Sequence, residues 1–309
     1  MNRLQRKSKR PSQPGTVFGM ASFEMIEDIL VCLANDNENT LERLSEHAGS
    51  FKQPKVIEMV FLLSEHWSQD NSTKYQAVEL LDRFLILHVE ELYKSSAKGL
   101  NSMEVKTWDS IKAEICDMFL LHLASCIQIT SKLHFHYNII NNHMILQFLR
   151  SAGYSYKKED IVRSELRVLT TLHFSINIHS PFTYIEMLLE VLGYNGSSLK
   201  MVDVQDMCVK VLDLVYLLRT PMYEAVLKAS VDLSTPTSLQ RSKFLPVKED
   251  QMLLATGVIS ASTFIINRDL WNEVLKHLSN ITGITVSSVF DMCSAILKHC
   301  VGKTALSNS

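Results

Sequence analysis

The stretch Tyr75–Leu85, which reads YQAVELLDRFL, decides the fold of this chain of 309 residues. Its apolar residues recur at helical spacing and form one stripe, so the segment predicts an amphipathic helix from Thr73 to about Tyr93. Asp82 and Arg83 interrupt the apolar run. A charge at such a position must turn outward or find a partner, because burying it alone is costly.

The composition extends this prediction to the whole chain. Hydrophobic residues make up 46% and charged residues 21%, as in a globular protein. Only 10 glycines and 7 prolines are present, and no proline lies between Pro54 and Pro181. Because proline interrupts helices and glycine weakens them, this pattern predicts an all-α protein.

Charge and cysteine usage narrow the function classes. The net charge of −2 gives no global attraction to nucleic acid, and the only dense basic cluster lies in the first ten residues. That segment predicts a disordered tail. Three roles are open for it: a nuclear-import signal, a weak nucleic-acid tether, or a solvated tail without a role. The six cysteines form no CxxC pair and no secretory leader is visible, so we expect reduced thiols inside the cell.

Helical spacing divides the chain into two groups of helices. Before the first group we expect a helix at Ser22–Leu33, a turn at Asp36–Thr40 and a short helix to about His47. The first group is predicted at 54–67, 73–93, 108–132, 142–152 and 157–172, and the second at 182–192, 201–218, 251–266, 270–281 and 286–300. The helix 108–132 is apolar on most sides and should lie in the middle of its group. Its apolar run is too short to span a bilayer, and Leu233–Lys248 reads as a loop.

Short motifs in the first group carry a family resemblance. The helix 54–67 precedes the Asp-Arg-Phe-Leu signature, the long helix ends in Thr130-Ser131-Lys132, and the last helix carries Val162-Arg163-Ser164-Glu165. An apolar run follows at Leu169, Leu172, Phe174 and Ile176. Over about residues 52 to 190 the chain resembles the cyclin family, whose members have Ala-Ser-Lys and Leu-Arg-Met-Glu at the corresponding places.

The resemblance implies a cyclin fold of two tandem five-helix boxes, the first around a buried long central helix. The predicted parts are a disordered basic tail (1–18), N-terminal helices (19–50), a first cyclin box (51–178), a second, divergent cyclin-like box (179–302) and a disordered C-terminal tail (303–309).

The resemblance also assigns residues. Asp82, Arg83 and Phe84 form the fold signature, and Lys132 and Glu165 are the expected kinase contacts. The residues themselves leave two roles open for Glu165. Its place on the stripe of Ile161, Leu169 and Leu172 fits either a structural pair or an interface, since a half-buried acid requires a cation or hydrogen-bond donors.

The chain also departs from the family. The family arginine that pairs with the aspartate of the second helix falls at Gln53 in an ungapped alignment. We therefore predict that Lys52 or Lys55 replaces it, or that Asp82 is more exposed than in the family. The groove that docks substrate motifs in this family is expected to be altered or absent.

No catalytic or phosphate-binding motif is present, so we expect neither an enzyme nor a cofactor. His134, His136 and His143, with His122 and Cys126, are the only metal-like set, and their spacing fits chance better than a zinc site. His122 and Cys126 read as core residues of the long helix.

The resemblance implies a non-catalytic regulator that binds a cyclin-dependent kinase. Meiotic members of the family imply a role in maturing recombination intermediates into crossovers. The alternative is a kinase-independent adaptor for recombination or replication factors. Direct nucleic-acid binding and membrane association are not expected, and the expected location is the nucleus, on chromosomes, and also the cytoplasm.

Overall fold

The computed structural model describes residues 18–98, 107–134, 138–194, 199–231 and 235–300. Within these residues every regular element is a helix, which confirms the prediction of an all-α protein. The predicted C-terminal tail and all but the last residue of the predicted N-terminal tail lie outside the described residues.

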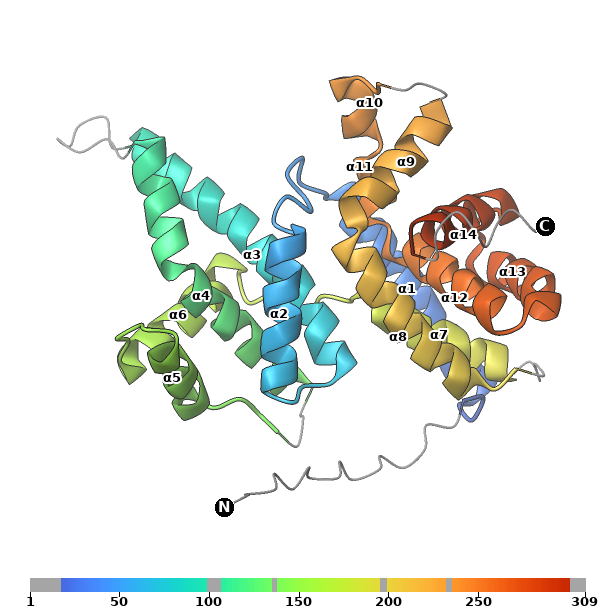
Figure 1. The fold of residues 1–309 in the computed structure, drawn as a ribbon, viewed down its shortest axis with the longest axis horizontal. Coiled ribbons are helices and arrows are strands. Elements are labelled where there is room, and N and C mark those ends of the chain that lie inside the picture. Colours follow the sequence, from blue (N-terminus) through green and yellow to red (C-terminus); the bar gives the residue numbers. More distant parts are fainter. Residues whose placement is uncertain (1–17, 99–106, 135–137, 195–198, 232–234, 301–309) are drawn as a thin grey trace, which may run out of the picture.

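The helices form two groups that lie side by side, with α1 packed on the second (Figure 1). The N-terminal helix is α1 (Phe23–Glu42). The first half comprises α2 (Pro54–His66), α3 (Asn71–Lys98), α4 (Trp108–Leu133), α5 (Asn142–Ser151) and α6 (Lys158–Thr171). The second half comprises α7 (Pro181–Tyr194), α8 (Met201–Leu217), α9 (Arg219–Val231), α10 (Ser238–Lys243), α11 (Leu245–Glu249), α12 (Gln251–Ile266), α13 (Arg268–Thr282) and α14 (Val286–Cys300).

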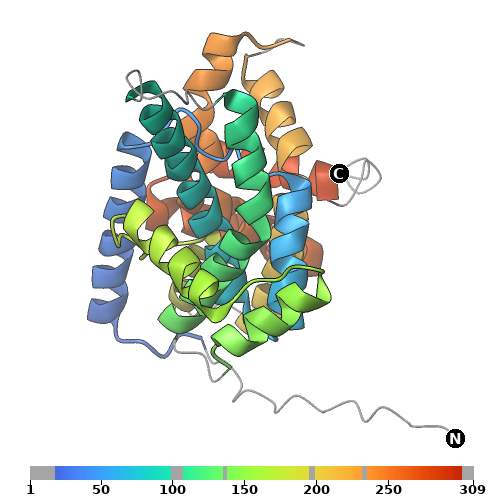
Figure 2. The same cartoon turned by 90° about the vertical axis from the view of Figure 1, so that its left-hand side faces the viewer.

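Each half is built around one buried helix. In the first half α4 runs among α2, α3 and α6, and its residues 121–131 are all buried (Figure 2). The sequence predicted this central position. By length and composition α4 could also cross a membrane, but a core helix passes the same test. In the second half α12 is buried from Leu254 to Thr263 and packs on α7, α8, α13 and α14.

The N-terminal helix is longer than predicted. Ser22 caps α1 by accepting a hydrogen bond from Met25 N, and the helix continues without a turn to Glu42. The expected turn at Asp36–Thr40 and the separate short helix are therefore wrong. A distant contact stabilises this polar stretch of α1. The amide nitrogen of Asn37 donates to Asp250 Oδ1 at 3.0 Å, which holds the stretch against the start of α12.

The second half has more helices than predicted. The five expected helices are present, and α9, α10 and α11 are additional. The predicted loop 233–248 is wrong where the structure describes it. Thr237 and Gln240 form a capping box that starts α10, and a proline in the first turn starts α11.

Candidate functional site

Lys132 and Glu165, the two predicted kinase contacts, form an ion pair with each other. Lys132 lies in the last turn of α4, where a cation is favoured by the helix dipole, and Glu165 lies in the middle of α6. Their side chains are 42% and 19% exposed. The structure therefore brings both residues to one place on the surface, where the pair remains open to a partner.

Exposed apolar side chains accompany this pair on α6. Val162 and Leu166 are exposed one turn apart, and Phe174 is 63% exposed just beyond the end of the helix. We call these three residues, with Lys132 and Glu165, the α4–α6 surface. It contains one accessible ion pair and three exposed apolar side chains that a bound partner would remove from water.

The backbone that presents Phe174 is strained. His173 and Phe174 both have positive φ angles, of 50° and 58°, a region that residues other than glycine rarely adopt. The Phe174 N–H donates to Leu169 O at 2.8 Å, which closes the end of α6. Strain of this kind costs about 1–3 kcal/mol per residue and is concentrated at functional sites.

A hollow of about 620 Å³ adjoins Lys132. It lies between the end of α4, the start of α5 and the start of α6. Its lining is basic and polar with an apolar part: Gln128, Lys132, Ile139, Ile140, Asn141, Asn142, His143, Leu146 and Lys158. Gln128 fixes one wall, because its amide nitrogen donates to Ile140 O at 3.1 Å and to Asn142 Oδ1 at 2.8 Å. The α4–α6 surface therefore has an open hollow at its edge, one wall of which is held by the hydrogen bonds of Gln128.

Asp82 is buried, and its hydrogen-bond partners are backbone groups. The N–H groups of Gly49 and Phe51 each donate to its carboxylate at 2.8 Å. Burial raises the pKa of Asp82, while Lys52 and these N–H groups act in the opposite direction. The alternative that Asp82 is more exposed is wrong, because Asp82 is buried. Among the described residues neither Lys52 nor Lys55 forms a direct ion pair with Asp82, but Lys52 is the cation whose charge lowers the pKa of Asp82, as the other alternative predicted. The chain before α2 supplies the hydrogen-bond donors.

The other signature residues divide between surface and core. Arg83 is exposed. Phe84 has no exposed surface, and its ring stacks on His88 with centroids 5.2 Å apart and meets the edge of His122 at 5.0 Å. Gln53 does not reach Asp82; its amide donates to Ser50 O at 3.1 Å.

Lys52 belongs to a buried ionic cluster that joins the two halves. Its ammonium group lies 2.6 Å from Glu79 on α3 and 2.6 Å from Glu249 at the end of α11. Arg219 at the start of α9 lies 2.6 Å from the other oxygen of Glu249. Tyr216 donates to Glu79 at 2.7 Å. Two cations and two carboxylates thus balance each other inside the protein, with all four side chains buried.

The ionic cluster shifts the pKa of its members. Burial opposes the charge of Glu249, but Arg219 and Lys52 prevail and lower its pKa to about 2. Burial likewise opposes the charge of Lys52, but Glu249 and Glu79 raise its pKa above the usual value. Both groups are therefore charged at neutral pH.

Among the described residues, no group of three or more histidines, cysteines, aspartates or glutamates could hold a metal ion. His136 lies outside that part of the chain. His122 and Cys126 are buried in α4, as predicted for core residues.

Two known proteins are similar in sequence to this chain over most of its length. The match to cyclin N-terminal domain-containing protein 1 of Mus musculus covers 92% of this chain and 86% of the mouse protein, with 45% identity over 287 residues. This chain belongs to the cyclin N-terminal domain-containing protein 1 family. The Homo sapiens protein of that name is also 45% identical over 287 residues, which are 87% of its length. No protein-family model matches the chain.

The ionic cluster of this family member was not predicted from the sequence. One signal was present: Glu79 lies three residues before Asp82, so α3 carries two acids on one buried face. Two buried acids require more than one source of donors. The sequence alone could not show that Arg219, 140 positions beyond Glu79, supplies part of the charge.

Gly49 lies against Glu249 of the ionic cluster, where a side chain would not fit. We expect Gly49→Ala to lower the free energy of unfolding by about 1–3 kcal/mol. Its φ angle is +76°, and a Cβ at this position would collide with Glu249 Oε1. Urea unfolding of the variant measures the loss.

Gly153→Ala is the matched control, since Gly153 has a φ angle of +88° but nothing lies within 4 Å of the place that a Cβ atom would take. The loss at Gly49 should exceed the loss at Gly153 because only Gly49 meets the cluster. Equal losses would contradict this account.

Proposed function

We propose that this chain is a non-catalytic cyclin-like regulator that binds a cyclin-dependent kinase through the α4–α6 surface. The observation that carries the proposal is the Lys132–Glu165 pair, which connects the end of α4 to the middle of α6 at the surface. Its residues are those that the cyclin resemblance assigns to kinase contact.

The chemistry of the pair suits a partner helix or loop. An ammonium group has three donors and a carboxylate has two oxygens, so the pair can persist while both residues bond to a partner's backbone. The exposed Phe174, Val162 and Leu166 add apolar area that a partner would remove from water. Charged groups would then fix orientation, and apolar groups would supply most of the affinity.

We further propose that the two halves are two cyclin boxes. The order of α2 to α6, with α4 at the centre, agrees with the first box. The second half differs more from a five-helix box, since it contains α9, α10 and α11 in addition to the five expected helices. A role in maturing meiotic recombination intermediates into crossovers, in the nucleus, rests on the family resemblance alone.

Substitution of both charged residues tests the kinase proposal. We expect Lys132→Ala with Glu165→Ala to reduce co-purification of a cyclin-dependent kinase from meiotic tissue at least about tenfold, since both polar anchors are lost. Kinase activity in the recovered complex should fall in parallel. The control is Glu90→Ala with Lys94→Ala, which removes another exposed ion pair from α3.

Normal recovery of the kinase by the Lys132/Glu165 variant, with normal meiotic function, would contradict the proposal. Circular dichroism of both double variants checks that each is folded.

A second candidate function is a kinase-independent adaptor for recombination or replication factors. The observation that favours it is the altered start of α2, where Gln53 bonds to Ser50 O and leaves the aspartate of the signature to backbone donors. If the adaptor function is correct, recombination or replication proteins should co-purify equally with the wild type and with the Lys132/Glu165 variant.

A further inference from the structure

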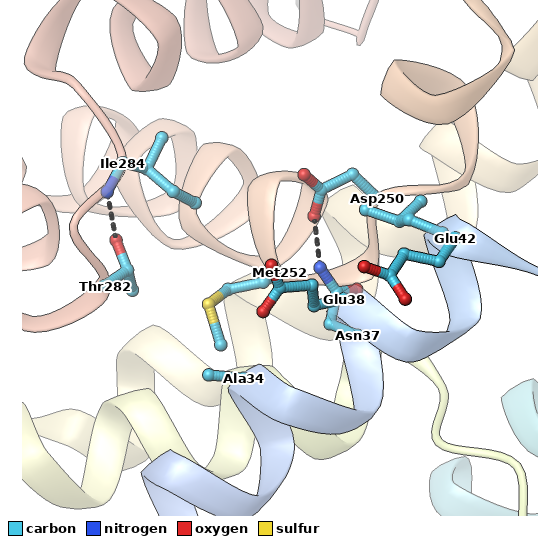
Figure 3. Close-up of a pocket in the computed structure, with 9 residues that line it drawn as sticks. Ala34, Asn37, Glu38, Glu42, Asp250, Met252, Thr282 and Ile284 are labelled. Carbon is cyan, nitrogen blue, oxygen red and sulfur yellow. Dashed lines mark hydrogen bonds between the residues drawn. The ribbon is translucent and has the colours of Figure 1, made fainter.

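A second hollow, of about 450 Å³, lies on the other half of the molecule from the α4–α6 surface (Figure 3). It is bounded by the C-terminal part of α1, the start of α12 and the loop between α13 and α14. Its floor is apolar, formed by Ala34 and Leu41 from α1, Met252 from α12 and Ile284 from the loop. We call it the α1–α12 groove. It could hold one or two apolar side chains of another molecule.

The rim of the α1–α12 groove is acidic. Glu38 and Glu42 lie one turn apart on α1, and Asp250 faces them from the start of α12 (Figure 3). Asp250 caps α12 by accepting from Leu253 N at 2.9 Å. In the part of the chain that the structure describes, none of the three acids forms an ion pair with a basic residue.

The electrostatics of this end of α1 are unfavourable. Like charges one helical turn apart repel each other. The last turn of α1 carries no basic residue, although the negative end of the helix dipole favours a cation there. Arg43 follows at the C-cap of α1, but among the described residues it forms no ion pair with Glu38 or Glu42, so these two acids leave negative charge beside the apolar floor.

We propose that the α1–α12 groove binds a basic peptide segment of a partner protein. One or two Lys or Arg side chains of the segment lie against Glu38 and Glu42, and an apolar side chain of the segment packs on the floor. Charge complementarity selects this occupant, since the same acids repel nucleic acid and anionic membrane surfaces. The groove is lined by α1, α12 and the loop after α13, whereas Lys132 and Glu165 lie on α4 and α6 in the other half (Figure 1), so this proposal does not rest on kinase binding.

Selection from a phage-displayed library of random nine-residue peptides, with the full chain as bait, tests the proposal. We expect the recovered peptides to combine Lys or Arg with a large apolar residue. Fluorescence anisotropy then measures the affinity of one labelled peptide. Glu38→Lys with Glu42→Lys should weaken binding at least about tenfold, because two attractions become repulsions.

Two further variants separate charge from shape. Ala34→Trp fills the groove and keeps every acid, and it should also weaken binding at least about tenfold. Glu58→Lys with Glu65→Lys makes the same change in net charge on the exposed face of α2 and should leave the affinity unchanged. Thermal unfolding confirms that each variant is folded.

Three results would overturn the proposal. The first is recovery of no basic peptides, and the second is binding that is unaffected by both groove variants. The third is binding that appears only when residues 1–17 are removed, because the chain's own basic tail would then be the occupant.

Discussion

Glu249→Gln is expected to lower the free energy of unfolding by about 3–5 kcal/mol, the usual cost of removing one member of a buried ion pair. Glutamine has the same shape but no charge, so Arg219 loses its carboxylate and Lys52 keeps one of its two direct ion-pair partners, Glu79. Both cations are buried and cannot turn to water. Both halves of the molecule should become less stable, because the cluster contains residues from each half.

Urea unfolding at pH 7 measures this loss. The control is Glu58→Gln, which makes the same chemical change on the exposed face of α2 and should alter stability by no more than about 0.5 kcal/mol. A loss below about 1 kcal/mol for Glu249→Gln would show that the cluster contributes little. Two separate unfolding transitions in the variant would show in addition that the cluster couples the halves.

The stability of the wild type should fall relative to His122→Gln as the pH is lowered from 7 to 4.5. Burial, with His88 and Arg167 nearby, lowers the pKa of His122 to about 4. Its value in the unfolded chain is 6.5. Between these two values the unfolded chain binds a proton that the folded chain refuses, so protons favour unfolding. The stability that neutral His122 contributes to the folded state is complete above pH 6.5 and is lost progressively as the pH falls toward 4.

Over the pH range from 6.5 to 4.5 the lost stability amounts to about 2.5 kcal/mol, at about 1.36 kcal/mol for each pH unit. Denaturant midpoints of the wild type and His122→Gln at several pH values measure it. The range above pH 4.5 avoids the titration of Glu249, whose stabilising charge is lost only as the pH falls from 4.5 toward 2. His143→Gln, at an exposed position, controls for the substitution itself. Parallel curves for the wild type and His122→Gln would refute the prediction.

The sequence predicted those features that depend on local patterns. Helical spacing located α2 to α6, because each has an apolar face that must be buried. It also showed that α4 is central, since α4 is apolar on most sides. Caps and a first-turn proline for α10 and α11 were visible as well, but the polar composition around them favoured a loop.

Features that depend on distant contacts could not be predicted. The polar stretch of α1 is stabilised against the start of α12 by the hydrogen bond from Asn37 to Asp250, 213 positions away. The carboxylate of Asp82 is satisfied by the N–H groups of Gly49 and Phe51, which no side-chain pattern reveals. The resemblance placed Lys132 and Glu165 at one site, but their direct ion pair depends on how α4 packs on α6.

The packing of α1 on the second half also affects how the protein is made. Its buried residues Ile26 and Leu33 are covered by helices such as α7 and α12, and Asn37 bonds to Asp250 at the start of α12. At 5–20 residues per second, a ribosome needs roughly 10–40 s to add the intervening 213 positions. For that time the contacts of α1 with α12 cannot form, although α7, which also packs on α1, is synthesised earlier. The final position of α1 can therefore be reached only after α12 has been synthesised.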